Sequence, residues 1–304
     1  MKVFVELWYT FKSLSSPTSK NPCVLLSLAI GDAYGAAFEY SPESMIAQHN
    51  TGQYYSKHPR HKIAPGHYTD DTQMTLAIAE ALVSGERWTP LNLASRFVEV
   101  FKRDPRVGYA GGFYKFLCEI KSGREFLEKI KPTSDKSGAA MRTTPIGLCE
   151  TLGEVEDKTR IQAAITHNTP DGIDAALAAS YMIFYFHKAH GLAKDLPAWL
   201  SSELDPRWAV PWEGKVKSKG WMSVRAAITA VSRNNSMTSL LIDCCNFRGD
   251  VDTVATIALA AASLCEDYEQ DLDEVLLHGL ENHTGYGRDY LIKLDSQLME
   301  RYDG

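Results

Sequence analysis

Apolar residues recur at the three- and four-residue spacing of an amphipathic helix in two well-separated stretches of the chain. The first set is Met74, Ala77, Ile78, Ala81 and Leu82, and the second is Val254, Ile257, Ala258 and Ala261. This spacing places each set on one face of a helix. Similar patterns occupy residues 24–39, 91–102, 113–121, 175–185, 224–228 and 289–299, and no strand pattern has comparable strength. The sequence therefore predicts an all-α protein.

The helical patterns begin only after a polar segment. Residues 13–22 contain two prolines and separate the apolar N-terminus from the patterned sequence. We therefore predict an N-terminal extension over residues 1–20 and one helical domain over residues 21–304. The proline- and tryptophan-containing residues 191–220 are expected to form an irregular surface segment of that domain.

Composition narrows the class of partner. The chain has 304 residues, 44% of them hydrophobic, and a net charge of −6. The negative charge argues against general binding to nucleic acids or anionic membranes, so we expect a small molecule or a modified macromolecule as partner. The six cysteines lack C-x-x-C spacing, and the N-terminus lacks the features of a signal peptide. A cytoplasmic protein with reduced thiols is the expectation.

Each of the two strongest helical patterns is preceded by a short acidic cluster. The clusters are Thr69-Asp70-Asp71-Thr72 and Asp250-Val251-Asp252-Thr253. Helix capping is one interpretation, because Asp and Thr are favoured at helix N-termini. Capping needs only one side-chain oxygen, however, and two clusters of several oxygens would repel without a cation. Oxygen ligands without neighbouring Cys or His favour Mg²⁺, Mn²⁺ or Ca²⁺ over Zn²⁺.

Several other segments carry weaker signals. Gly31 and Gly35 would let another backbone approach the first helix closely. Asp32 and Glu39 would form an acidic stripe on that helix, which needs partners if it is buried. Alternatively, Glu39 is a surface residue before the Ser41-Pro42 break. The glycines of residues 107–112 indicate a tight turn, and the small residues of 134–142 could hold a phosphate or form a plain turn. His58 and His61 lie in a segment expected to be an exposed loop rather than a zinc site.

Taken in order, these motifs resemble the ADP-ribosylglycohydrolase family, which includes bacterial dinitrogenase-reductase-activating glycohydrolases and ADP-ribosyl-acceptor hydrolases. Residues 31–39 resemble its first helix, and the two acidic clusters resemble its two metal motifs. The resemblance extends from about Val24 to about Ala262. It implies a single compact orthogonal helical domain with a binuclear metal cleft.

The resemblance also implies roles for individual residues. The metal ligands of two Mg²⁺ or Mn²⁺ ions would be Thr69, Asp70, Asp71, Asp250, Asp252 and Thr253. The ADP-ribose group would contact Ser137, Gly138, Ala139, Met141, Arg142 and His167, although a histidine at a helix start is more commonly structural. Glu39 or a clustered aspartate such as Asp71 would be the general base for water attack at the distal ribose.

Two departures from the family pattern affect this interpretation. Arg248-Gly249 replaces a common Gly-Gly pair and is expected to narrow or charge the cleft, and Ser137 replaces a common Asn. The expected substrate is a mono-ADP-ribosylated protein, with a mild preference for an arginine linkage, and the product is ADP-ribose. The alternatives are a non-catalytic ADP-ribose-binding or structural protein, as in certain jellyfish lens crystallins, or a metal-dependent hydrolase of another nucleotide or ADP-ribosyl conjugate.

Overall fold

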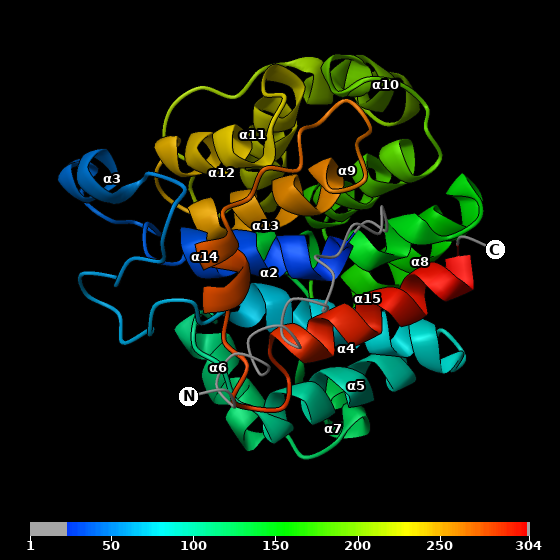
Figure 1. The fold of residues 1–304 in the computed structure, drawn as a ribbon. Helices are drawn as coiled ribbons and strands as arrows, with labels where there is room; N and C mark the ends of the chain where they lie inside the picture. The colour runs from blue at the N-terminus through cyan, green and yellow to red at the C-terminus, as the bar shows by residue number, and fades with distance from the viewer. Residues whose placement is uncertain (1–22, 303–304) are drawn as a thin grey trace, which may run out of the picture.

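The computed structural model describes residues 23–302, which form layers of packed helices (Figure 1). Within this range, β-type pairing is confined to isolated bridges, so the all-α prediction is confirmed. The predicted extension over residues 1–20 lies outside the described residues. The α-helices are α2 (Val24–Gly35), α3 (Glu43–His49), α4 (Asp70–Ser84), α5 (Pro90–Arg103), α6 (Gly111–Glu119), α7 (Gly123–Lys129), α8 (Leu152–Ala164), α9 (Pro170–His187), α10 (Leu196–Glu203), α11 (Gly220–Arg233), α12 (Met237–Asn246), α13 (Val251–Ala262), α14 (Glu274–Gly279) and α15 (Arg288–Tyr302).

Short 3₁₀ helices complete the fold. They are η2 (Ser137–Ala139), η3 (Thr144–Leu148), η4 (Ala193–Asp195) and η5 (Pro206–Ala209). The segment predicted to be irregular, residues 191–220, contains α10, η4 and η5 and buries Trp208. It is therefore more ordered and more helical than its prolines suggested.

Helices α2 and α13 lie side by side at the centre of the molecule (Figure 1). Every residue of both helices is buried. A Cβ atom on Gly31 would lie 2.6 Å from the carbonyl oxygen of Ala255, and one on Gly35 would lie 2.5 Å from Cα of Asp252. The predicted close backbone approach at these glycines is confirmed, and it brings the second acidic cluster against α2.

Helix α2 ends earlier than the acidic stripe predicted. Its last residue is Gly35, and residues 36–40 form turns in which the Glu39 N–H donates to the Gly35 carbonyl at 3.0 Å. Tyr40 has a left-handed φ of 46° and donates its N–H to the Gly249 carbonyl at 2.8 Å. Glu39 therefore shares no regular helical face with Asp32, because the chain turns here to meet the second acidic cluster.

The N-terminus of α2 is capped from another helix. Its own N-cap residue, Cys23, makes no side-chain cap. Instead, the buried Asp295 of α15 accepts hydrogen bonds from the backbone N–H of Leu25 at 2.8 Å and of Leu26 at 3.0 Å. Burial raises the pKa of Asp295 to about 7, opposed by these backbone hydrogen bonds. Helix α15 is thereby tied to the central pair.

Two further findings concern the cysteines and the apolar character of the helices. Within residues 23–302 no disulfide joins the cysteines. None of the described helices combines the length and the apolar character that crossing a membrane requires. The cytoplasmic location remains an expectation from sequence.

The raised pKa of Asp295 predicts how Asp295→Asn changes the pH dependence of stability. Because the folded-state pKa exceeds the unfolded value, ionisation of Asp295 lowers the free energy of unfolding as the pH rises from about 4 to about 7. Asn cannot ionise, so the stability advantage of the wild type over Asp295→Asn should shrink between about pH 4 and about pH 7. Urea unfolding of both proteins in EDTA measures this, and an unchanged difference would contradict it.

Candidate metal centre and active site

The first acidic cluster is positioned by Asp32 of α2. Its carboxylate accepts hydrogen bonds from the backbone N–H groups of Thr69 and Thr72, both at 2.9 Å. It also accepts from their hydroxyls, at 2.8 Å from Thr69 Oγ1 and 2.6 Å from Thr72 Oγ1. Asp32 thus caps α4 from outside, and both of its oxygens are already engaged.

Glu39 meets the carboxylates of the second cluster where the end of α2 lies against α13. Glu39, Asp250 and Asp252 each offer an oxygen, and these oxygens all lie within 4.8 Å of one another. Asp250 also accepts a hydrogen bond from Ser223 Oγ at 3.0 Å. The structure therefore joins Glu39 to the second cluster, which excludes the alternative that it is only a surface residue.

The surroundings of these carboxylates favour their protonated forms unless a cation is present. Burial is the main cause that raises the pKa of Glu39 to about 7 and of Asp250 to about 6, and repulsion by neighbouring carboxylates adds to the shift of Glu39. Burial and neighbouring carboxylates also place the pKa values of Asp70, Asp71 and Asp252 well above the usual range. Each shift has the sign expected when like charges share a site of low dielectric.

The donor set fits a hard divalent cation. Oδ1 of Asp71 is buried and has no hydrogen-bond partner in the part of the chain that the structure describes. The N-cap residues of α4 and α13, Thr69 and Asp250, make no side-chain cap to the backbone N–H groups of their own helices. Local capping therefore does not explain the clusters, whereas carboxylate and hydroxyl oxygens with unmet partners are what Mg²⁺ or Mn²⁺ binds.

A glycine turn packs against the first cluster. Gly108 has φ 110°, and a Cβ atom there would lie 2.1 Å from Asp70 Oδ1. This confirms the tight turn predicted for residues 107–112. The turn leads into α6 and places Tyr109 and Phe113 beside the acidic residues.

A cavity of about 370 Å³ opens over these carboxylates, within the range of about 300–1,000 Å³ typical of small-molecule sites. Most of the residues predicted for the site line it: Glu39, Asp70, Asp71, Ser137, Gly138, Met141, Arg142, His167, Asp250, Asp252 and Thr253. Thr69 and Ala139 do not. Thr69 lies behind the cluster and bonds to Asp32, while Ala139 is packed with Ala163 and Ala176.

Arg142 is part of the cavity wall, and its guanidinium is hydrogen-bonded to other residues of the protein. Its guanidinium donates to Gln162 Oε1 at 2.7 Å and to Thr166 Oγ1 at 2.9 Å, and it lies over the Phe97 ring at 4.5 Å. Burial lowers its pKa to about 9. The side chain thus braces the end of α8 and the turn that leads to His167, and it is not an exposed phosphate clamp.

His167 presents a neutral ring to the cavity. Burial, followed by the positive charge of Arg142, lowers its pKa to about 3. Its Nδ1 lies 2.7 Å from Thr166 Oγ1, and its Cε1 would lie 3.1 Å from a Cβ atom added to Gly138. The ring can therefore act as a hydrogen-bonding or packing surface, and Gly138 allows it to approach.

Arg248 does not charge the cleft, contrary to expectation. Its side chain pairs with Glu43 and is absent from the cavity lining. Its left-handed φ of 64° and the φ of 92° at Gly249 explain why two glycines suit this turn. The sequence departure therefore alters the outside of the turn.

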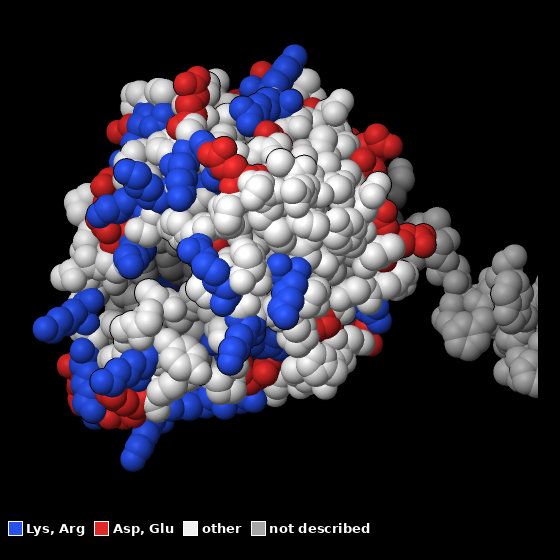
Figure 2. Space-filling model, turned by 90° about the vertical axis from the view of Figure 1, so that its left-hand side faces the viewer, with Lys and Arg blue, Asp and Glu red and all other residues white. Residues whose placement is uncertain are grey.

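Some lining residues carried too little sequence signal to be selected. They include Tyr40, Tyr109, Phe113, Lys131, Lys136 and Ser218. Isolated lysines and aromatic residues occur throughout the chain, and only the fold shows which of them surround the carboxylates. Figure 2 shows lysine and arginine side chains gathered around a hollow on one face of the molecule.

Comparison with known proteins agrees with this architecture. The ADP-ribosylglycohydrolase family model matches residues 23–304. The chain is 27% identical over 248 residues to the ADP-ribosyl-[dinitrogen reductase] glycohydrolase of Rhodospirillum rubrum, covering 77% of this chain and 81% of that protein. It is 24% identical over 276 residues to human ADP-ribosylhydrolase ARH3, covering 67% and 76% respectively.

Two further similarities extend the comparison. The ADP-ribosylarginine hydrolase Tri1 of Pseudomonas putida is 24% identical over 254 residues, covering 77% of this chain and 67% of that protein. A solved structure titled ADP-ribosylglycohydrolase-related protein complex superposes with a TM-score of 0.73 at 20% identity, covering 92% and 97% of the two chains. The chain is thus an all-helical hydrolase in class. It belongs to the ADP-ribosylglycohydrolase family.

The contact at Gly108 predicts the effect of Gly108→Ala. The added methyl group would overlap Asp70 in a backbone conformation that alanine adopts poorly, so the free energy of unfolding should fall by about 1–3 kcal/mol. The Mg²⁺-induced rise in Tm should also shrink. Gly111→Ala is the control, because nothing lies within 4 Å of a Cβ atom there. Equal effects of the two substitutions on Tm would contradict the proposed packing.

Proposed function

We propose that this protein removes ADP-ribose from a modified acceptor by cleaving the glycosidic bond at the distal ribose. The observation that carries the proposal is the placement of the carboxylates: they gather beneath a cavity of about 370 Å³ whose walls include lysines and aromatic rings. Anionic oxygens at the bottom of the cavity can bind a cation and the hydroxyl groups of a sugar. The lysines and aromatic rings of the walls can bind a diphosphate and a nucleobase. Membership of the family supports the same reaction class.

Two Mg²⁺ or Mn²⁺ ions are proposed at the base of the cavity. The proposed ligands that line the cavity are Asp70, Asp71, Asp250, Asp252 and Thr253. Thr69, which lies behind the cluster, would be the sixth ligand. Its hydroxyl donates its proton to Asp32, so the lone pairs of the Thr69 oxygen remain available for a cation. Bound cations of this kind supply positive charge that orients hydroxyl groups and makes water more acidic.

Glu39 is the proposed general base. It borders the cavity, no hydrogen bond restrains its carboxylate in the described residues, and burial raises its pKa to about 7. A base with a pKa near the working pH combines adequate ionisation with adequate proton affinity. Glu39 would take a proton from the attacking water and return one to the leaving group, and Asp71 would stabilise the developing positive charge on the ribose.

The remaining lining residues would hold the ADP-ribosyl group. Lys131 and Lys136 supply positive charge for the diphosphate. Ser137 and Gly138 have small side chains, so the diphosphate can approach the backbone beside them. Phe113 offers a flat apolar surface, and the neutral His167 offers a nitrogen or a stacking face. Met141 completes the apolar wall.

An arginine-linked protein is the preferred acceptor. The printed names of the Rhodospirillum and Pseudomonas relatives specify ADP-ribosyl-dinitrogen reductase and ADP-ribosylarginine. A serine-linked or other conjugate is the competing acceptor. Mass spectrometry of free ADP-ribose released from arginine-linked and serine-linked peptides, with Mg²⁺ or with EDTA, separates them. Release of AMP or phosphate instead would indicate a different hydrolase, and tight binding without release would indicate a binding protein.

Glu39→Gln should abolish most turnover while leaving binding intact. Loss of the base is expected to lower kcat by about a hundredfold or more, because proton transfer typically contributes that much. Affinity for ADP-ribose and the Mg²⁺-induced shift in Tm should persist, measured by calorimetry and thermal unfolding. Glu266→Gln, an exposed residue, is the control. Loss of the Mg²⁺ effect together with turnover would make Glu39 a ligand instead of the base.

Asp252→Ala tests the metal role of the second cluster. It should remove the Mg²⁺-dependent rise in Tm and lower kcat/KM by more than about a hundredfold, since a lost ligand alters the charge at the reacting ribose. The apo variant should unfold at the same temperature as the apo wild type or higher, because it lacks a buried carboxyl group whose ionisation is disfavoured by burial and by neighbouring carboxylates. Full turnover with unchanged Mg²⁺ affinity would show that the cluster is structural.

A further inference from the structure

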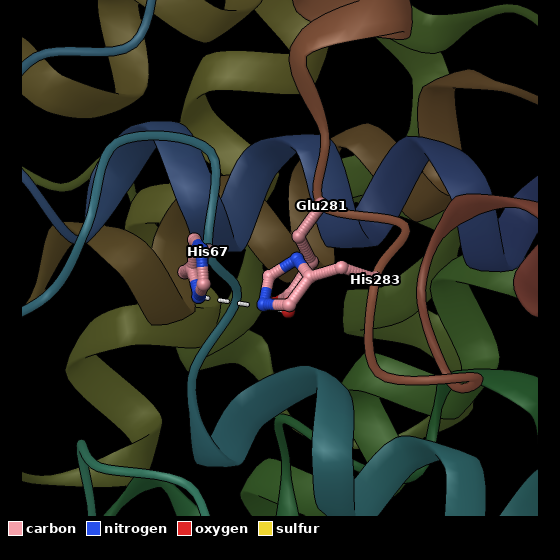
Figure 3. A group of neighbouring side chains, drawn as sticks. All are labelled: His67, Glu281 and His283. Atoms are coloured by element: carbon pink, nitrogen blue, oxygen red, sulfur yellow. Dashed lines mark ion pairs between the residues drawn. The ribbon is translucent and has the colours of Figure 1, made fainter.

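A second group of potential metal ligands lies outside the cavity. His67, from the segment that precedes α4, faces Glu281 and His283, from the loop between α14 and α15 (Figure 3). Each residue offers one ligand atom, and these atoms all lie within 4.8 Å of one another. None of the three lines the cavity over the acidic clusters. The group is therefore separate from the proposed reaction centre.

Glu281 is the informative member. Its side chain is fully buried. Oε1 accepts from the backbone N–H of Tyr68 at 3.1 Å and from the guanidinium of Arg106. Oε2 is also buried but has no hydrogen-bond partner among residues 23–302, and it lies 3.6 Å from Nδ1 of His67. One oxygen is thus fixed by protein donors, while the other is held toward the histidines with its bonding capacity unused.

This arrangement resembles a metal site in which hydrogen bonds from the protein orient a ligand. Carboxylates that bind metals are oriented by hydrogen bonds to the oxygen that does not bind. Two imidazoles and one carboxylate are a donor set that Zn²⁺ prefers, with the fourth position left to water. Ligands bound to tetrahedral Zn²⁺ at about 2.0–2.1 Å are about 3.3 Å apart, close to the 3.6 Å between His67 Nδ1 and Glu281 Oε2.

We propose that His67, Glu281 and His283 form a binding site for Zn²⁺ or a similar borderline transition metal. His67 is partly buried and His283 is exposed, so both rings can turn toward the fixed carboxylate oxygen. Their ring centroids are already 4.9 Å apart. A bound ion would satisfy the buried Oε2, which otherwise lacks a hydrogen-bond partner.

The other close histidine pair shows that proximity alone is insufficient. The rings of His58 and His61 have centroids 4.3 Å apart. His58 is buried, its Nε2 bonds to the Glu39 carbonyl at 2.9 Å, and its Nδ1 accepts from the backbone N–H groups of Arg60 and His61. Both nitrogens of His58 are occupied, and no carboxylate joins the pair. His61 is therefore a suitable control position.

The proposed ion would link two segments that are far apart in sequence. Hydrogen bonds already join the two segments, from Glu281 N–H to the Gly66 carbonyl at 3.0 Å and from Tyr68 N–H to Glu281 Oε1 at 3.1 Å. A metal bond from His67 would add a further connection two residues before Thr69. The role assigned to the site is structural: it holds the α14–α15 loop against the approach to α4.

Titration with Co²⁺ and Zn²⁺ tests the site directly. Tag-free protein in excess Mg²⁺, which competes at the acidic clusters, is titrated with Co²⁺ and its visible absorption recorded, and Zn²⁺ is then added as competitor. The wild type should bind one equivalent with the absorption of low-coordinate Co²⁺. His283→Ala and His67→Ala should weaken that binding by more than about tenfold, because each removes a direct ligand. His61→Ala should bind as the wild type does.

Several outcomes would overturn the proposal. They are no binding by the wild type, equal binding by His283→Ala, or an equal loss in His61→Ala. If His67→Ala unfolds, shown by circular dichroism, the exposed position of His283 leaves His283→Ala as the deciding variant. X-ray absorption of the Zn²⁺-loaded wild type gives a second readout: two imidazole ligands support the site, and all-oxygen coordination contradicts it.

Discussion

The buried carboxylate of Asp32 organises the reactive half of this molecule. It binds both the main-chain N–H and the hydroxyl of Thr69 and of Thr72, so a single side chain caps α4 and fixes the orientation of its first turn. Because α2 also packs directly against α13 through Gly35, the same helix places both acidic clusters. The site therefore depends on α2 more than on either helix that carries the ligands.

The clustered carboxylates are unfavourable on their own. Burial raises the pKa values of Glu39 and Asp250 to about 7 and about 6. Repulsion by Asp250 and Asp32 adds to the pKa shift of Glu39, and the charge of Lys136 opposes the shift of Asp250. A folded protein retains such an unfavourable group of carboxylates only if the rest of the core is stable enough to hold it in place. Here the fully buried α2 and α13 supply that stability, and a bound cation would reverse the sign of the electrostatic contribution.

The sequence predicted the parts of the fold and site that depend on local pattern. Helical spacing identified α4 and α13, and the cluster composition identified their N-termini as the reactive region. The Gly31 and Gly35 spacing correctly indicated a close helix contact. Local pattern could not show that Asp295 caps α2 across a separation of 270 residues in sequence, or that Lys136 and Phe113 line the same cavity as the carboxylates. Those contacts depend on tertiary packing, which has no periodic signal.

Two arginines have partners that the sequence did not indicate. Arg142 was expected to contact the ADP-ribose group, and it does line the cavity, but its guanidinium also meets buried acceptors on Gln162 and Thr166. Arg248 was expected to narrow or charge the cleft, and it meets Glu43 outside the cavity instead. A long side chain reaches several possible partners, so its sequence position does not determine the partner. Short side chains such as Asp70 and Thr253 have no such choice, and the sequence placed them correctly at the cavity.

The segment before α4 shows how precision at the site can be achieved without a rigid secondary structure. Residues 64–69 are not helical, yet the N–H of Tyr68 is held by Glu281 and the N–H of Thr69 by Asp32. The two carboxylates come from opposite ends of the chain and bind consecutive peptide groups. Since the backbone between Tyr68 and Thr69 has few remaining degrees of freedom, the first acidic cluster is positioned from both sides. Loss of either carboxylate would free only one of these peptide groups, so the two ends of the chain stabilise the same turn independently.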